Sequence, residues 1–114
     1  MQTAGLRFLV PSLLGILLLG RTLVATADGA ATFQEKCATC HGDKGQGIEG
    51  LAPPLKGNTF VTSASAADLK SHIVNGRTGK NRRYPKIPGG MPGVLMPEPE
   101  LEALVKYVTG DLQK

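Results

Sequence analysis

The chain has 114 residues, of which 41% are hydrophobic but only 4% aromatic, so one small domain with few rings in its core is expected. Such a domain lies near the small end of what a polypeptide core alone can stabilise. The formal net charge is +4, yet no basic patch is interleaved with aromatic residues. Nucleic acid is therefore excluded as an expected partner.

Residues 1–27 have the pattern of a secretory signal peptide. Arg7 precedes an apolar run from Phe8 to Leu19, and Ala25-Thr26-Ala27 fits a small-residue cleavage site. The run is short for a membrane span, so an uncleaved N-terminal anchor is the second interpretation. We expect cleavage and export, most naturally to a bacterial periplasm, with no stable membrane insertion afterwards. Residues 28–114 then form one mature domain with eleven basic and nine acidic residues, a formal charge of +2.

A first helix is predicted over residues 28–39. Asp28 is suited to the N-cap position, and Phe33 and Cys37 share a face because they lie four residues apart. We expect this helix to end into Gly42 and to carry the cysteines toward the centre of the domain.

The segment Cys37-Ala38-Thr39-Cys40-His41 contains both cysteines of the chain and ends in a histidine. C-x-x-C-H is typical of c-type haem attachment. Two thiols at this spacing can add to the two vinyl groups of one haem, and His41 can then supply the proximal imidazole ligand. A redox dithiol, a structural disulfide and a zinc site are the alternatives. The first lacks a βαβ pattern, and the last has only His72 as a further histidine.

A loop and a second helix are predicted next. Five glycines and Pro53-Pro54 interrupt residues 42–58, so a long regular element is excluded there. Residues 65–75 favour a helix, because Ser65 and Asp68 resemble a capping box and an apolar stripe follows. Gly76 is well placed to end this helix. The stripe consists of Leu69, Ile73 and Val74.

A second loop and a last helix complete the chain. Residues 77–96 contain a basic run from Lys80 to Arg83 and are then rich in proline and glycine. The last helix is predicted from Pro97 or Glu98 to Thr109, since its apolar residues follow the i, i+3, i+4, i+7 spacing. These residues are Leu101, Leu104, Val105 and Val108. Without strand-like alternation anywhere, the mature chain is predicted to be all-α and rich in loops.

The mature sequence closely resembles the class I cytochromes c, which are small mono-haem electron carriers. The resemblance extends over nearly all of residues 28–109. It is carried by Gly29, Phe33 and Cys37, by the haem motif, by Ala52-Pro53-Pro54-Leu55, by Ile73-Val74-Asn75-Gly76, and by Leu104 and Tyr107.

This resemblance implies a fold of about three main helices and long loops around one haem c, held covalently by Cys37 and Cys40. It further implies that the last helix crosses the first near Gly29. A proline carbonyl, that of Pro53 or Pro54, would accept a hydrogen bond from the ring of His41.

The family also implies a methionine as the sixth ligand of the iron. Met91 and Met96 are both followed by proline, but Met96 lies at the start of the last helix, with little chain left to cross the distal side of the haem. We therefore favour Met91, so that His41 and Met91 would ligate the metal. His72 is interpreted as an ordinary, partly exposed helix residue, with distal ligation as the alternative.

Together these features predict a periplasmic, monomeric one-electron carrier that is not an enzyme and that meets donor and acceptor proteins. The alternatives are a cytochrome subunit of a larger oxidoreductase, and a haem sensor or peroxidase with an open sixth position. The segment from Lys80 to Lys86 is a docking patch for an acidic partner or a solvated loop. Tyr84 within it contacts a haem propionate or caps the loop.

Overall fold

The computed structural model describes residue 20 and residues 26–114, so the predicted signal peptide lies almost wholly outside the described residues. Helices account for all regular structure in residues 26–114, where only isolated bridges pair Ile48 with Ala52 and Arg77 with Met91. The elements are α1 Gly29–Lys36, α2 Ala38–His41, α3 Thr59–Ser63, α4 Ala66–Asn75, the 3-10 turn η1 Gly79–Asn81, α5 Glu98–Thr109 and the 3-10 turn η2 Asp111–Gln113. The all-α, loop-rich prediction is confirmed.

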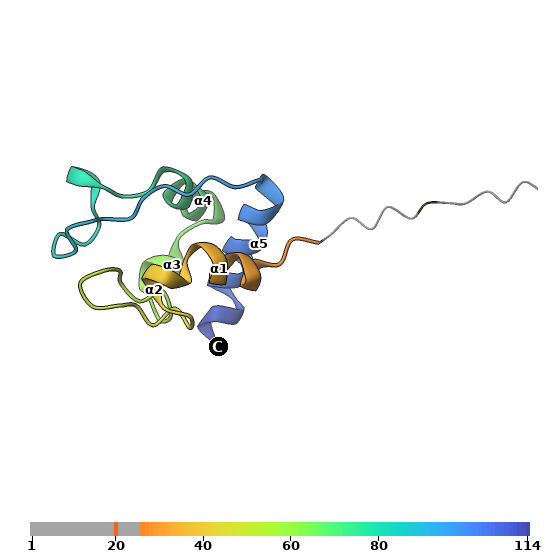
Figure 1. Cartoon of the computed structure of the whole chain (residues 1–114), viewed down its shortest axis with the longest axis horizontal. Coiled ribbons are helices and arrows are strands. Elements are labelled where there is room, and N and C mark those ends of the chain that lie inside the picture. Colours follow the sequence, from red (N-terminus) through yellow and green to blue (C-terminus); the bar gives the residue numbers. More distant parts are fainter. Residues whose placement is uncertain (1–19, 21–25) are drawn as a thin grey trace, which may run out of the picture.

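The two terminal helices pack against each other at the centre of the domain, as Figure 1 shows for α1 and α5. Gly29 makes this crossing possible, because a Cβ atom there would overlap the carbonyl oxygen of Ala103. Further along α1, the fully buried ring of Phe33 lies 5.6 Å from the ring of Tyr107, measured between centroids. The expected crossing near Gly29 is therefore present.

The first helix is shorter than predicted, because the backbone turns at Cys37. Asp28 caps α1 as expected, accepting hydrogen bonds from the amides of Ala30 and Ala31. Cys37 has φ −120° and ψ −35°, away from ideal helical values, and α2 then starts anew at Ala38. The prediction of one continuous helix to Thr39 was wrong. The bend redirects the chain between the two cysteines, and α2 continues to His41.

The second predicted helix is observed as α4 with both of its expected ends. The hydroxyl of Ser65 accepts a hydrogen bond from the amide of Asp68 at 3.1 Å, and Gly76 ends the helix with φ +69°. A short helix that we did not predict, α3, precedes it. The side chain of Asn58 caps α3 by accepting from the amides of Phe60 and Val61.

The last helix agrees with its prediction, and all four apolar residues of its stripe are buried. The chain then continues into η2, which places Leu112 in a core cluster with Phe33, Leu104 and Val108. In the part of the chain that the structure describes, no helix combines the length and the apolar character needed to cross a membrane.

Candidate haem site

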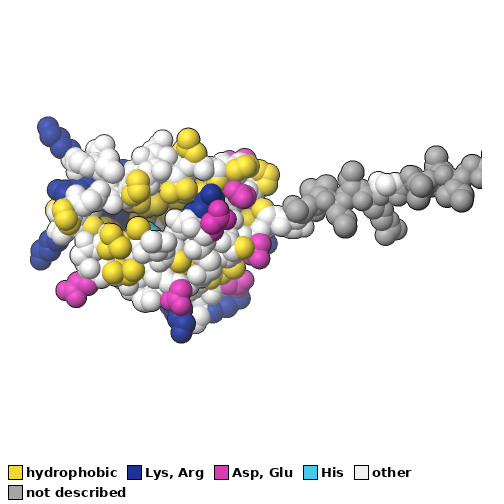
Figure 2. Space-filling model, in the orientation of Figure 1, with side chains coloured by type: hydrophobic (Ala, Val, Ile, Leu, Met, Phe, Trp, Pro, Cys, Tyr) yellow, Lys and Arg dark blue, Asp and Glu magenta, His cyan; other side chains and the backbone are white. Residues whose placement is uncertain are grey.

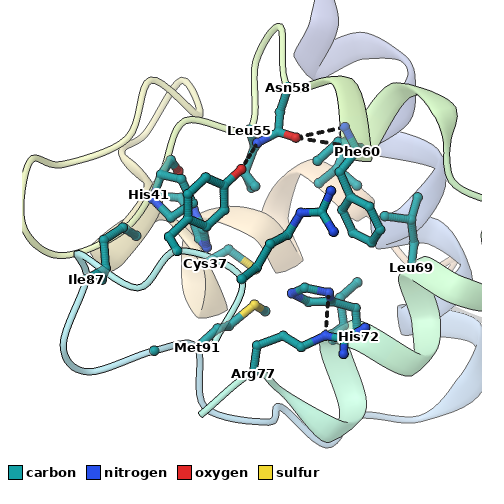
Figure 3. A pocket seen from close by; sticks show the side chains of 18 of the residues that line it. Cys37, His41, Leu55, Asn58, Phe60, Leu69, His72, Arg77, Ile87 and Met91 are labelled. Atoms are coloured by element: carbon teal, nitrogen blue, oxygen red, sulfur yellow. Dashed lines mark hydrogen bonds between the residues drawn. The ribbon is translucent and has the colours of Figure 1, made fainter. Parts of the chain in front are cut away.

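A cavity lies between the helices and the two loops, and contains about 960 Å³ of space between atoms, part of it open to solvent. Figure 1 shows both loops on the same side of the molecule. Most of the lining is apolar: Leu51, Ala52, Pro53, Leu55, Phe60, Val61, Leu69, Ile73, Ile87, Leu104 and Val108. Figure 3 shows the interior of this cavity with side chains reaching in from the junction of α1 and α2, from α2, α3 and α4, and from the second loop. No aspartate or glutamate lines it.

The two cysteines are free thiols, both partly buried, at the junction of α1 and α2. Cys37 lines the cavity, whereas Cys40 is not among the lining residues. Burial raises the pKa of the Cys37 thiol to about 11; the nearby Cys40 adds to this shift and Lys36 opposes it. In the polypeptide alone, the Cys37 sulfur is therefore a neutral thiol near pH 7.

His41 is only 7% exposed and lines the same cavity. Its Nδ1 lies 2.9 Å from the carbonyl oxygen of Pro53. A carbonyl oxygen can only accept, so Nδ1 carries the proton and the lone pair of Nε2 remains free. Burial lowers the pKa of His41, and the bond to Pro53 partly opposes this shift. The ring is thus fixed as a neutral imidazole, and Pro53 rather than Pro54 orients it.

Met91 lines the cavity from the second loop, with its thioether inside, as Figure 3 shows. Its backbone is held in both directions by Arg77: the amide of Arg77 donates to Met91 at 2.7 Å, and the amide of Met91 donates back at 2.9 Å. Gly76 packs directly beneath this pair. Met96 lies elsewhere, packed against the Phe33–Leu104 core cluster. The structure therefore brings Met91, and not Met96, to the cavity wall.

His72 is a partly exposed residue of α4, as predicted, but it also lines the cavity, which the preferred sequence interpretation did not include. Its ring lies 5.2 Å from that of Phe60, and its Nδ1 receives a 3.1 Å hydrogen bond from Nε of Arg77. Burial lowers the pKa of His72, and the positive charges of Arg77 and Arg83 lower it further. A sequence signal was present, since His72 lies three residues after Leu69 on the same stripe of α4.

Three arginines, Arg77, Arg82 and Arg83, bring positive charge to the cavity wall. The Arg83 guanidinium lies 4.1 Å from the centroid of the Phe60 ring. Arg82 donates from Nη1 to the carbonyl of Pro88 at 2.9 Å, but its buried Nε has no hydrogen-bond partner among residues 26–114. A buried N–H without an acceptor is costly. The unpaired Nε–H of Arg82 in this apolar cavity fits a ligand that is mostly apolar and carries carboxylates at one edge, as haem does.

Tyr84 belongs to the same wall and links the second loop to α3. Its hydroxyl oxygen accepts a 2.9 Å hydrogen bond from Nδ2 of Asn58, the residue that caps α3. The loop is thereby tied down at the cavity, which agrees with the loop-capping interpretation of Tyr84.

A sequence profile of the Cytochrome c family matches residues 26–110, and the chain therefore belongs to this family. It is 34% identical over 93 residues to the fructose dehydrogenase cytochrome subunit of Gluconobacter japonicus, covering 79% of this chain and 17% of that protein. It is 49% identical over 47 residues to cytochrome c-552 of Thermus thermophilus, covering 41% of this chain and 31% of that protein. The chain thus spans less than a third of the length of these curated relatives.

Among solved structures, the KustC0563 c-type cytochrome superposes with a TM-score of 0.50 at 24% identity, covering 73% of this chain and 95% of that one. This likeness supports the fold. Family membership implies a covalent haem c, and Cys37 and Cys40 have the required spacing. The predicted family, fold and cofactor are confirmed, and an electron-transfer role fits the family.

Proposed function

We propose that the mature chain is an exported one-electron carrier in which His41 and Met91 are the two axial ligands of its haem iron. The observation that carries this proposal is the presence of Cys37, His41 and Met91 on the wall of one apolar cavity. When bound, the haem supplies an iron that exchanges one electron between its ferrous and ferric states.

Other residues of the chain hold the two proposed ligands, His41 and Met91, in position independently of electron transfer. Pro53 fixes the tautomer of His41, so that Nε2 presents its lone pair, and the paired backbone of Arg77 holds the loop of Met91. A thioether is a soft, neutral donor that stabilises reduced iron and raises its potential relative to two imidazoles. Filling both axial positions leaves no open position for a substrate, which supports a carrier rather than an enzyme.

Arg77, Arg82 and Arg83 give one edge of the cavity a positive charge, and we call this the positive edge. Arg82 and Arg83 would hold the propionates of the haem through charge-assisted hydrogen bonds. Figure 2 shows Lys and Arg side chains projecting at the side of the loops, next to exposed hydrophobic side chains. We assign the segment from Lys80 to Lys86 as a docking patch for a partner with acidic groups around its own redox centre. Donor and acceptor would meet the monomer there in the periplasm, after removal of residues 1–27.

A second candidate function is that of a fixed subunit in a larger oxidoreductase. It is favoured by two relatives that are cytochrome subunits of an alcohol dehydrogenase and of a fructose dehydrogenase. Purification of the native protein from its own cells separates the two. A free carrier elutes from size-exclusion chromatography at the mass of the single chain, whereas a subunit co-elutes with a catalytic chain in fixed ratio.

Optical spectra of both redox states, combined with a potentiometric titration, test the ligand assignment. Wild-type ferric protein should show the weak red band of methionine-ligated haem. Met91→Ala should abolish this band and allow the ferrous protein to bind carbon monoxide, while the matched control Met96→Ala should do neither. The opposite pattern would assign the ligand to Met96, and rapid carbon monoxide binding by the wild type would indicate a sensor or peroxidase.

A further inference from the structure

We propose that Arg77 is a positioning residue that keeps His72 from competing with Met91 for the iron, by fixing the proton of the His72 ring on Nε2. This inference rests on the proposed function, because it assumes that Met91 is the sixth ligand. It assigns to the chain a specific device for choosing between two potential ligands.

His72 is a competitor by position. It lines the same cavity as His41 and Met91. Figure 3 shows the imidazole reaching in from α4 and the thioether of Met91 reaching in from the second loop. Imidazole is a common haem ligand, so a histidine on this wall needs a reason not to bind.

The hydrogen bond from Arg77 supplies that reason. The guanidinium only donates, so Nδ1 of His72 must be the nitrogen without a proton, 3.1 Å from Nε of Arg77. The proton of the neutral ring is then on Nε2, and a protonated ring nitrogen has no lone pair for a metal. For Nε2 to ligate, the proton would have to move to Nδ1, where it would face another N–H.

The surroundings hold the ring in this orientation. The Phe60 ring lies 5.2 Å from the His72 ring at a tilt of 44°, and the Arg83 guanidinium lies over the Phe60 ring. Turning the imidazole over would place a carbon against the Nε–H of Arg77 and lose the hydrogen bond. No aspartate or glutamate of the chain lines the cavity to accept from Arg77 instead.

The same arginine also supports the preferred ligand. The backbone of Arg77 forms both hydrogen bonds to the backbone of Met91, while its side chain donates a hydrogen bond to His72. A side-chain substitution leaves the backbone pair in place, so the two roles can be separated by mutation.

The test compares holoproteins with covalently attached haem: wild type, Arg77→Leu, His72→Phe, the double variant, and Lys80→Leu as a charge control. Lys80 lies in the same loop, and within residues 26–114 no hydrogen bond joins it to His72. We expect Arg77→Leu to lose the red band of methionine ligation and to have a lower potential, because two imidazoles would ligate the iron. The double variant should regain the band, and His72→Phe and Lys80→Leu should keep it.

Two results would overturn the inference while leaving the proposed function intact. In the first, Arg77→Leu retains the band and potential of the wild type. In the second, the double variant lacks the band as Arg77→Leu does, so that Arg77 acts through the loop and not through His72. Absence of the band from the wild type, with no change in Met91→Ala, would instead overturn the proposed function and the inference together.

A direct measurement covers the case in which Arg77→Leu fails to mature. Nitrogen-15 NMR of the imidazoles in wild-type ferrous protein reports which nitrogen of His72 carries the proton. A proton on Nε2 supports the inference, and a proton on Nδ1 overturns it.

Discussion

Gly29 in α1 and Ala103 in α5 approach so closely that the missing side chain of Gly29 is part of the helix contact. A Cβ atom there would overlap the Ala103 carbonyl oxygen and would also meet Cβ of Tyr107 at 2.8 Å. Both neighbours belong to a helix, so neither can move aside without shifting α5. Cys37, which lines the cavity, follows directly on α1. A substitution at Gly29 therefore tests how much the α1–α5 contact stabilises the helix that precedes Cys37.

We expect Gly29→Ala to lower the free energy of unfolding by about 1–3 kcal/mol, because the added methyl overpacks the helix crossing. Guanidinium unfolding of the holoprotein measures this change. Gly89→Ala is the matched control, since nothing lies within 4 Å of a Cβ at Gly89. Equal stability of the two variants would contradict the close contact.

Leu104 and Leu95 form a second matched pair, because they are 1% and 80% exposed. Leu104 belongs to the core cluster and also lines the cavity. Leu104→Ala should cost about 2–5 kcal/mol of unfolding free energy, through lost burial and the space left behind. Leu95→Ala should stay within about 0.5 kcal/mol of the wild type. Chemical denaturation followed by circular dichroism distinguishes these outcomes. A small effect at Leu104 would show that packing of this side chain contributes little to the stability of the holoprotein.

Ser65 caps α4 through its hydroxyl, and α4 carries Leu69 and His72 to the cavity. Ser65→Ala should reduce the free energy of unfolding by about 1 kcal/mol, because the amide of Asp68 loses its acceptor. Ser65→Asp retains an acceptor and should keep most of the stability. If both variants are destabilised equally, the cap is not the cause.

Removal of the covalent attachment should prevent folding. In Cys37→Ala/Cys40→Ala, the chain would have to close or hydrate a mostly apolar cavity, about 960 Å³ of interatomic space that is partly open to solvent, with a core of nine buried hydrophobic residues in the described part of the chain. We expect little helical signal in the far ultraviolet and no cooperative unfolding transition. Met91→Ala, which retains both cysteines, should remain helical. A cooperative, helical double variant would show that the polypeptide folds without haem.

The helices were predictable because their signals are local. Asp28, Ser65 and Gly76 lie at helix ends where side-chain caps or a positive φ are needed, and the α5 stripe follows helical spacing without interruption. The bend at Cys37 was not predictable, since nothing in Lys36-Cys37-Ala38 disfavours a helix. Short helix α3 had a signal in Asn58, a good N-cap residue, but five residues are too few for a periodic pattern.

The site was predictable where one short segment carries the chemistry. Cys37, Cys40 and His41 are neighbours in the chain, and their spacing together with the export pattern indicates haem attachment. The sequence could not show whether the carbonyl of Pro53 or that of Pro54 accepts from the His41 ring. Only the folded loop shows that it is the carbonyl of Pro53. The hydrogen bond between Arg77 and His72 was not predictable for a similar reason: it depends on how the end of α4 turns into the second loop.

The backbones of Arg77 and Met91 are hydrogen-bonded to each other in both directions. The segment from Thr78 to Gly90 between them therefore begins and ends at the same place in the structure. The backbone pair thus fixes the position of Met91 at the base of this segment, apart from the contacts made further along it. Arg82, Arg83 and Tyr84, which shape the positive edge, all belong to this segment. Under the proposed function, we expect substitutions at its exposed lysines, Lys80 and Lys86, which do not line the cavity, to change partner choice while the iron keeps its ligands.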